Sequence, residues 1–363
     1  MLQAQGLRLV AVFDWDNTVI KNDVGDAVFF WMLVHNQILA PEGGDWRKTS
    51  PYLTLAAAEA LGTACGSTAA GQPVQTARNV ECAETFLAIY LNATTPDGWP
   101  AFGGFQQRWM EPAYAWAAQL MAGRPPDEMR TIAAAAIEAG LAAPAGATQM
   151  IGRRPKLAAY LRIYPQMQDL IRALSAAGVE VWIVSASAQV VVEPFAARLG
   201  IPPERVVGVR TILDSNSRLT ARLEGCGPVA DGENRLMTYM DGKRCWINKA
   251  IFGDRGPEAI FRVVDLQRRI VFGAGDSQTD ATFLRDATEL RLVVDRRKAE
   301  LMCYALANDD GKWLVQPMFI EPKAPRADPY PCATAACVSP TGELLPCLDS
   351  AGKVIPDQGG KKP

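Results

Sequence analysis

Three short apolar runs, each followed directly by polar residues, constrain the fold of this chain more than any other feature. They span residues 9–13, 179–184 and 270–272, and short runs rich in β-branched residues are typical of buried parallel strands. Helical patterns lie between them. In residues 165–177 the apolar side chains form one stripe, and Gly178 follows as a helix stop. This alternation predicts an α/β fold with a doubly wound parallel sheet and helices on both faces.

The chain divides into four parts by composition. Residues 1–24 and 156–318 carry the predicted strands, and we assign them to the core. Residues 25–155 are Ala-rich, helical in pattern and hold most of the tryptophans, so we interpret them as a helical domain inserted after the first strand. Residues 319–363 are rich in Cys, Pro and small residues without a hydrophobic period. This composition predicts an irregular tail, cross-linked to the core and disordered at its end.

Composition and charge argue against several classes of function. The formal net charge is −2 and no long basic run occurs, so nucleic acid is not expected as a partner. The longest apolar stretches are far shorter than the roughly 20 residues that cross a bilayer, which predicts no membrane span. The single histidine, His35, is expected to pack on a helix or at the surface. Zinc sites built from several histidines and Ser-His-Asp triads are therefore disfavoured, and carboxylates, lysine or serine must carry the chemistry.

The eight cysteines form no CxxC pair. They lie at positions 65 and 82, 226 and 245, 303, and 332, 337 and 347. This spacing favours disulfides over a metal site and so favours a periplasmic or secreted protein; free buried thiols are the alternative. The first ten residues, MLQAQGLRLV, lack the basic and apolar regions of a signal peptide. A cytoplasmic protein, or one whose leader was removed, fits that observation.

Two carboxylates follow the first predicted strand, in the segment Asp14-Trp15-Asp16-Asn17-Thr18. Side chains two residues apart project to the same side of an extended chain. Two carboxylates so close in a dry site need a cation or a proton between them, and Mg²⁺ is a hard cation that prefers oxygen ligands. Such a pair is also common on protein surfaces, so its position at the end of a buried strand is what favours a functional site.

Polar residues follow the other two predicted strands as well. Ser185 ends the second, where a hydroxyl can bind a phosphate oxygen or cap a helix. The third runs into Gly-Ala-Gly and then Asp276 and Asp280, which we expect at the start of a helix, on one face. Lys243 opens another helical run and can neutralise a bound phosphate. Lys249 is the alternative for this role.

The order of these motifs resembles the haloacid dehalogenase superfamily, in its phosphoserine-phosphatase-like branch with a cap inserted after the first motif. The resemblance covers about residues 7–20 and 160–300. Within that branch the stretches IYPQMQDLIRALSAAGVEVWIVSAS and MTYMDGK look most like bacterial phosphorylcholine phosphatases. An acid at position 16 separates the chain from the dehalogenases and ion pumps of the superfamily, and implies a phosphate monoester as substrate.

The resemblance also implies a role for each motif residue. Asp14 would attack phosphorus and form an aspartyl-phosphate, and Asp16 would protonate the leaving alcohol and then activate water. Thr18, Ser185 and Lys243 would bind the phosphate. In the same scheme Asp280 orients Lys243, and Mg²⁺ is bound by the Asp14 carboxylate, the Asp16 backbone carbonyl and Asp276.

The inserted domain is expected to select the substrate, a small phosphorylated metabolite. Six aromatic residues lie close together in it, namely Trp99, Phe102, Phe105, Trp109, Tyr114 and Trp116. They predict either the domain's own core or an aromatic cage for a cationic group such as choline, with Asp26 or Glu111 adding charge. Two other functions fit the same fold: a catalytically idle binding module and a phosphotransferase.

Overall fold

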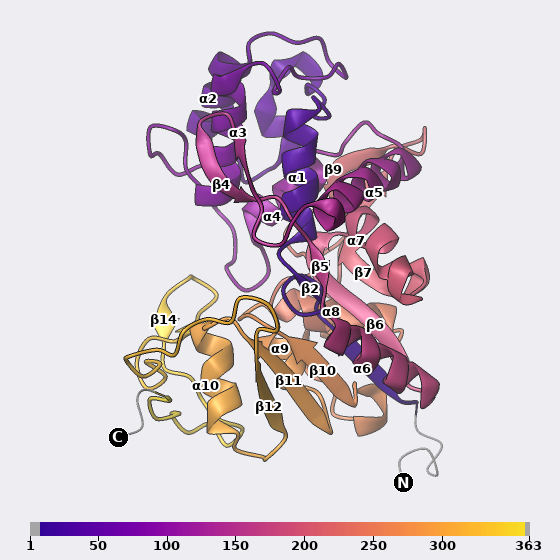
Figure 1. Cartoon of the computed structure of the whole chain (residues 1–363), viewed down its shortest axis with the longest axis vertical. Helices are drawn as coiled ribbons and strands as arrows, with labels where there is room; N and C mark the ends of the chain where they lie inside the picture. The colour runs from indigo at the N-terminus through magenta and orange to yellow at the C-terminus, as the bar shows by residue number, and fades with distance from the viewer. Residues whose placement is uncertain (1–7, 360–363) are drawn as a thin grey trace.

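A six-stranded parallel sheet forms the centre of the computed structural model, which describes residues 8–359 (Figure 1). The strand order is β12-β11-β10-β1-β6-β7, and every pairing is parallel. The strands are β1 (Val10–Phe13), β6 (Glu180–Ala188), β7 (Val206–Val209), β10 (Phe272–Gly275), β11 (Leu290–Asp295) and β12 (Trp313–Pro317). The predicted doubly wound α/β fold is confirmed.

The central strand β1 is completely buried, and its side chains alternate between two apolar cores. Ala11 and Phe13 pack into the core under α6 (Pro165–Ala176) and α7 (Gln189–Ala196). Val10 and Val12 face the opposite core, under α8 (Asp241–Ala250), α9 (Ala281–Leu284) and α10 (Ala299–Ala307). β6 pairs with β1 on one side and β10 pairs with it on the other, so β1 lies at the point where the strand order changes direction. Ligands of such sheets bind at this switch point, beyond the carboxyl ends of the strands.

The third predicted strand is shifted along the chain. The apolar run at 270–272 predicted its position, but β10 runs from Phe272 to Gly275 and so contains both glycines of Gly-Ala-Gly. A Cβ on Gly273 would lie 2.7 Å from Leu284 Cδ2, and a Cβ on Gly275 would lie 2.5 Å from Asp280 Cβ. Glycine is therefore required here by close packing of the following segment, which removes the apolar signal from the strand.

Helices dominate the segment inserted after β1 and lie above the sheet in Figure 1. They are α1 (Val24–Val34), α2 (Leu55–Cys65), α3 (Val80–Asn92), α4 (Pro112–Gln119) and α5 (Pro126–Ala142), with short 3-10 turns at Glu42–Gly44 and Trp46–Thr49. A hairpin follows, β3 (Thr148–Ile151) and β4 (Arg154–Ala158). The predicted boundary between residues 155 and 156 falls inside β4. Because a hairpin is one unit, we place the end of the insertion after Ala158.

Short strands connect the insertion to the core and to a second hairpin. β2 (Ile20–Lys21) enters the insertion and pairs antiparallel with β5 (Arg162–Ile163), which leaves it. The hairpin of β8 (Thr211–Leu213) and β9 (Leu219–Leu223) follows β7 and packs against α4. Backbone hydrogen bonds join Leu219 to Gly123 and Arg124 of the insertion. The remaining 3-10 turns are Ala197–Leu199, Pro203–Arg205, Pro257–Ile260 and Leu266–Arg268.

All eight cysteines are paired, as the spacing favoured. Cys65–Cys82 joins α2 to α3, and Cys226–Cys245 anchors α8. In the tail, Cys303–Cys332 links α10 to the chain after β12, and Cys337–Cys347 closes the small hairpin of β13 (Cys337–Val338) and β14 (Leu344–Leu345). The predicted cross-link of tail to core is therefore confirmed. The very end of the tail, residues 360–363, lies outside the described residues.

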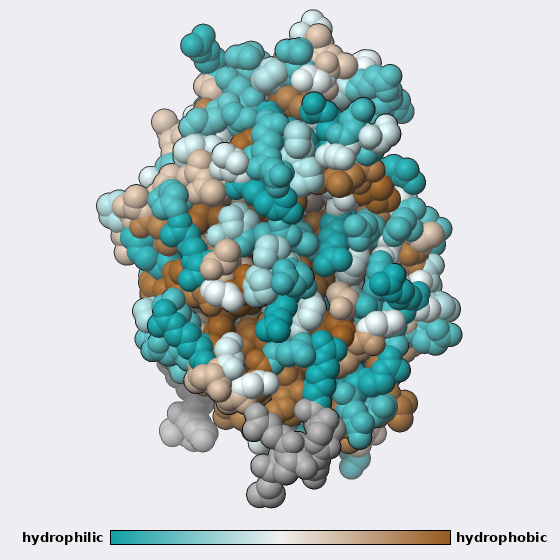
Figure 2. Space-filling model, turned by 90° about the vertical axis from the view of Figure 1, so that its right-hand side faces the viewer, coloured by the Kyte–Doolittle hydropathy of each residue, from teal (hydrophilic) through white to brown (hydrophobic). Residues whose placement is uncertain are grey.

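Polar residues cover most of the face of the molecule in Figure 2, and apolar residues reach the surface between them, more in the lower half of that view. Within residues 8–359, the structure contains no helix with the length and apolar character needed to cross a membrane.

Removing the Cys303–Cys332 bond tests how far the tail contributes to stability. The two cysteines are 29 residues apart, and closing a loop of that size lowers the entropy of the unfolded chain. We expect a Cys303→Ser/Cys332→Ser variant to lose about 3 kcal/mol of unfolding free energy, measured by urea denaturation without reductant. Unchanged stability, with Cys303 and Cys332 unlinked in a non-reducing peptide map of the wild type, would contradict this pairing.

Candidate active site

Polar side chains from three neighbouring strands meet at one edge of the sheet. Asp14 follows β1, Ser185 lies near the end of β6, and Asp276 follows β10. Asp14 continues the ladder, because its backbone N–H donates to the carbonyl of Ala274 at 2.9 Å. The carboxyl ends of these parallel strands lie side by side, so the fold brings together residues more than 250 positions apart.

Asp14 is buried and both of its oxygens have partners. Lys243 Nζ lies 2.7 Å from Oδ1 and Thr18 Oγ1 lies 2.9 Å from Oδ2. Burial raises the pKa of Asp14 to about 6, although the charge of Lys243 opposes this shift. The Thr18 hydroxyl also lies 3.2 Å from Asp276 Oδ1, so it bridges two carboxylates. An ionised Asp14 held in this way is oriented by a cation on one side and a hydroxyl on the other.

Asp16 has a different environment from Asp14. Its Oδ1 accepts the backbone N–H of Val24 at 2.7 Å, and its Oδ2 accepts the Ser187 hydroxyl at 2.8 Å. Ser185 Oγ is 3.3 Å from the same oxygen. Burial, with the charges of Asp23 and Asp14, raises the pKa of Asp16 well above its usual range. A carboxyl with a raised pKa can retain a proton to donate, so the two carboxylates of the first motif are suited to different tasks.

Lys243 is fully buried between two carboxylates. Its Nζ lies 2.7 Å from Asp14 and 2.6 Å from Asp280 Oδ1. Burial alone would lower the pKa of Lys243, but the charges of Asp14 and Asp280 raise it, so the amine stays protonated. Lys249, the alternative from the sequence, lies elsewhere: its Nζ donates to the carbonyl of Gly225 and sits over the Trp246 ring. The structure thus brings Lys243 to the site.

The segment between Asp276 and Asp280 differs from our expectation of a helix start. Helix α9 begins at Ala281, and residues 276–280 form a turn. Asp280 Oδ2 accepts the backbone N–H groups of Asp276 and Ser277 at 3.0 and 3.1 Å, which folds the chain back on itself. This side-chain-to-backbone bonding competes with a helix, as is common for Asp. It also fixes Asp280 so that its other oxygen faces Lys243.

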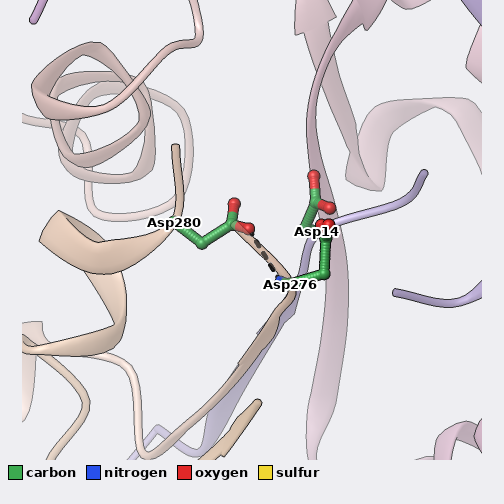
Figure 3. A group of neighbouring side chains, drawn as sticks. All are labelled: Asp14, Asp276 and Asp280. Carbon is green, nitrogen blue, oxygen red and sulfur yellow. Dashed lines mark hydrogen bonds between the residues drawn. The ribbon is translucent and has the colours of Figure 1, made fainter. Parts of the chain in front are cut away.

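Three carboxylates gather closely enough to bind a metal ion. One oxygen each of Asp14, Asp276 and Asp280 lies within 4.8 Å of the others (Figure 3). Asp280 is engaged by Lys243 and two backbone N–H groups, so Asp14 and Asp276 are the better ligands. With the half-buried Asp16 and Asp23, five carboxylates gather here, and among the described residues the nearby cations are Lys243, Arg296 and Lys298. This excess of negative charge and these oxygen donors fit a divalent cation.

A small cavity of about 70 Å³ lies over the carboxylates, between the core and the insertion. Its floor includes Asp14, Asp16 and Asp276, and its upper wall includes Phe29, Tyr90, Tyr114 and Met121. The remaining lining residues are Asp23, Gly25, Ala117, Ala118, Ala186, Ser187, Ala188, Val191, Ser277, Thr279 and Arg296. Core and insertion therefore both contribute residues to one partly open site.

Of the two alternatives for the six clustered aromatic residues, the aromatic cage is wrong for five of them, and the core of the insertion is right for two. Trp116 and Phe102 are buried in the core of the insertion, where Trp116 donates to Thr49 Oγ1. Trp99 is 66% exposed at the surface. Phe105 packs on Tyr52, and Trp109 packs against the core under α8. Tyr114 alone of the six lines the cavity. Tyr114 and Trp116 share α4 but face different directions, and the other four residues lie in non-helical segments before it, so clustering in sequence did not mean clustering in space.

The two acids proposed to add charge to that cage lie in different places. Asp26 accepts the hydroxyl of Tyr90 at 2.8 Å, directly behind the cavity wall. Glu111 instead caps α4 through the N–H of Ala113 and does not line the cavity.

Several cavity residues were not singled out from the sequence, and three of them carry polar or charged groups next to the carboxylates. Ser187 lies two residues after Ser185 on the same strand, and that spacing was a usable signal. Asp23 caps α1, as an Asp before an apolar helical run often does. Arg296 follows β11 and its Nη1 lies 2.6 Å from Asp276 Oδ2. Arg291 interrupts the apolar run of β11, so neither the strand nor its polar end stood out.

The chain belongs to the haloacid dehalogenase-like hydrolases, because the family model for these proteins matches residues 97–285. The segment of Asp14, Asp16 and Thr18 precedes the matched range. Comparison with curated proteins gives no match.

Two solved structures share the fold over most of their length. A conserved protein of unknown function from Anaerococcus prevotii DSM 20548 is 19% identical, with a TM-score of 0.60 and coverage of 86% of this chain and 85% of its own. A protein of unknown function from Bordetella pertussis Tohama I is 14% identical, with a TM-score of 0.50 and coverage of 86% and 100%.

The buried Asp26 gives a prediction for pH. Burial and the charge of Asp23 raise the pKa of Asp26 to about 7, above the value of about 3.9 in an unfolded chain. The folded state thus holds this proton more tightly, and stability is lost as pH rises from about 4 to about 7. We expect Asp26→Asn to gain about 1 kcal/mol or more over the wild type between pH 5 and pH 8, measured by urea denaturation. A difference that stays constant with pH would contradict this.

Proposed function

We propose that the protein is a phosphomonoester hydrolase that acts through an aspartyl-phosphate on Asp14. The observation that carries the proposal is the buried contact of Asp14 with Lys243 and Thr18, next to a second carboxylate with a raised pKa. Family membership supports a hydrolase. The fold alone does not specify the reaction, so the proposal rests on the site.

Each residue of the site receives a role from its environment. Asp14 attacks phosphorus, and the P–O bond to the leaving alcohol breaks as the Asp14–phosphorus bond forms. Asp16 gives its proton to the leaving oxygen and then accepts one from the water that hydrolyses the aspartyl-phosphate. Lys243, Thr18 and Ser185 bind phosphoryl oxygens. Asp280 keeps Lys243 in place through the 2.6 Å ion pair.

Mg²⁺ is the proposed cofactor. Asp14, Asp276 and the backbone carbonyl of Asp16 would hold it, consistent with the excess of buried carboxylates. When bound, the ion supplies positive charge that stabilises the phosphoryl oxygens as negative charge builds up on them.

The cavity favours a small organic phosphate with a cationic leaving group, and a phosphocholine-like ester is the proposed candidate. Its upper wall has three aromatic side chains, Phe29, Tyr90 and Tyr114, and Asp23 lies beside them. Aromatic faces and a carboxylate attract a small cation. Of these three aromatic residues, only Tyr114 belongs to the cage predicted from the sequence. The four disulfides further support a periplasmic or secreted location.

Phosphate release from a panel of phosphomonoesters, including phosphocholine and phosphoserine, tests the function. We expect turnover that requires Mg²⁺, stops with EDTA, and falls by about 10³-fold or more in Asp14→Asn. Asp265→Asn, which removes an exposed carboxylate that caps a 3-10 turn away from the site, is the control. Folded protein without turnover on any ester would favour an idle binding module. Product that rises with added acceptor alcohol would favour a phosphotransferase.

The small volume of the site cavity should limit the size of the leaving group, and a neighbouring cavity offers a way to test this. This cavity, of about 280 Å³, shares Ala118, Met121 and Ala188 with the site. Met121 is the only large side chain of the three, so Met121→Ala should join the two spaces. We expect kcat/KM for esters with longer leaving groups to rise about 10-fold relative to short ones, with Met121→Leu as the control of similar volume. An unchanged ratio would contradict this partition.

A further inference from the structure

Arg108 binds the two segments that carry Lys243 and Asp280, on the side away from the cavity. Its Nε and Nη2 donate to the two oxygens of Asp241 at 3.0 and 2.9 Å, and Nη2 also lies 2.9 Å from Thr282 Oγ1. Asp241 lies two residues before Lys243, and Thr282 lies two residues after Asp280. Thr282 Oγ1 donates to Asp241 Oδ1 at 2.8 Å.

The same two segments are thus joined twice. The Lys243–Asp280 ion pair joins them inside the site, and the Asp241–Thr282 contact joins them behind it, spanned by Arg108. Asp241 and Lys243 belong to the first turn of α8, about 3 Å apart along the helix axis. A shift of Asp241 therefore moves Lys243. Lys243 is fully buried, so the loss of a carboxylate partner would leave its charge without compensation.

The backbone of α8's start depends on the Arg108 segment as well. The carbonyl of Arg108 accepts the N–H of Asp241 at 3.1 Å, and that of Trp109 accepts the N–H of Met237 at 2.9 Å. Met240 has a positive φ of 44°, a strained conformation for a methionine. The approach to Lys243 therefore needs external contacts to hold its conformation, and residues 108–109 provide them.

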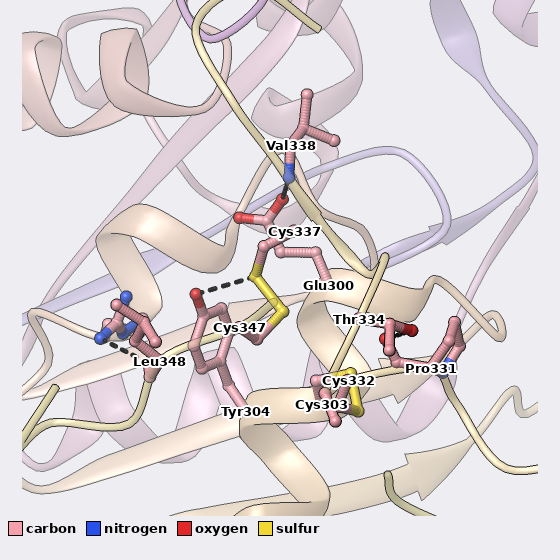
Figure 4. The surroundings of a disulfide bond; sticks show 12 residues. Glu300, Cys303, Tyr304, Pro331, Cys332, Thr334, Cys337, Val338, Cys347 and Leu348 are labelled. Atoms are coloured by element: carbon pink, nitrogen blue, oxygen red, sulfur yellow. Dashed lines mark hydrogen bonds between the residues drawn. A yellow bond between two sulfur atoms is a disulfide. The ribbon is translucent and has the colours of Figure 1, made fainter. Parts of the chain in front are cut away.

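The cross-linked tail completes the binding site of Arg108. Arg108 Nη1 lies 2.9 Å from the carbonyl oxygen of Val338 and 3.2 Å from Glu300 Oε1. Glu300 Oε2 in turn accepts the N–H of Val338, next to the Cys337–Cys347 bond (Figure 4). Cys303 lies one helical turn from Glu300 on α10 and binds Cys332. The tail lies outside the range matched by the family model, which ends at residue 285.

We propose that Arg108 is a positioning residue that holds Lys243 against Asp14, and that the disulfide-linked tail is part of this device. The proposal rests on the proposed function, since it assigns Lys243 a part in catalysis. Nε, Nη1 and Nη2 of Arg108 together make five hydrogen bonds to surrounding oxygens. The single ammonium group of a lysine cannot reproduce this planar arrangement of donors. Arg108 thus couples the tail to the site without touching substrate.

The test compares steady-state kinetics of Arg108→Lys, Arg108→Gln and Thr282→Val on the best ester of the wild type. We expect kcat to fall on the order of 10- to 100-fold in both Arg108 variants and less in Thr282→Val, because small misplacements of a catalytic group are costly. KM should change by less than about 3-fold. In a Lys243→Gln background, Arg108→Gln should reduce kcat by less than about 2-fold further, since its effect passes through Lys243.

Arg291→Gln is the control, because Arg291 is a buried arginine that is likewise paired with a carboxylate, Asp310, but at the other end of the sheet. It should lose stability but keep kcat, with thermal unfolding recorded for every variant.

A Cys337→Ser/Cys347→Ser variant tests the part of the tail. It should lower kcat about 3- to 10-fold, because Val338 would be held less firmly against Arg108. Wild-type kcat in the Arg108 variants, or full additivity with Lys243→Gln, would overturn the positioning role alone. A wild-type protein without turnover would overturn the proposed function and this inference together.

Discussion

The buried ion pairs of Lys243 are the interaction on which the rest of the site depends. Asp14 and Asp280 are buried carboxylates that would repel each other, and the lysine between them resolves this at 2.7 and 2.6 Å. Removing one partner of such a buried pair typically costs about 3–5 kcal/mol, because the other charge is left without compensation. The three residues come from three separate segments. The two ion pairs therefore form only if β1, α8 and the turn after β10 keep their positions relative to one another.

The surrounding structure fixes the relative positions of these three segments from two sides. The sheet places Asp14 and Asp276 on adjacent strands, and glycines in β10 let the turn of Asp280 approach closely. Behind the site, Arg108 fastens the start of α8 to the residues that follow Asp280. The insertion lines the upper wall of the cavity, while the tail contacts Arg108 through the carbonyl of Val338. In the proposed positioning role of Arg108, three of the four disulfides restrain segments that support Lys243: Cys226–Cys245 holds α8, and Cys303–Cys332 and Cys337–Cys347 hold the tail.

Much of the core and of its polar residues could be predicted from sequence, since both rest on local signals. Short β-branched runs predicted β1 to within one residue and the start of β6, which runs four residues past its predicted end. Asp14, Lys243, Asp276 and Asp280 meet as the order of motifs implied. What failed depends on tertiary context. Whether Trp116 or Tyr114 faces the cavity is decided by how α4 packs, and Arg108 has no local signal because its partners lie more than 130 residues away.

Acid-quenched single turnover followed by mass spectrometry tests the central claim most directly. With a small ester and Mg²⁺, the account predicts a peptide that carries Asp14 and is heavier by one phosphoryl group, absent from the Asp14→Asn protein. Arg108→Gln should accumulate this species more slowly, at equal substrate occupancy. Turnover without a phosphorylated Asp14, or a phosphoryl group on another residue such as Ser185 or Ser187, would contradict the account.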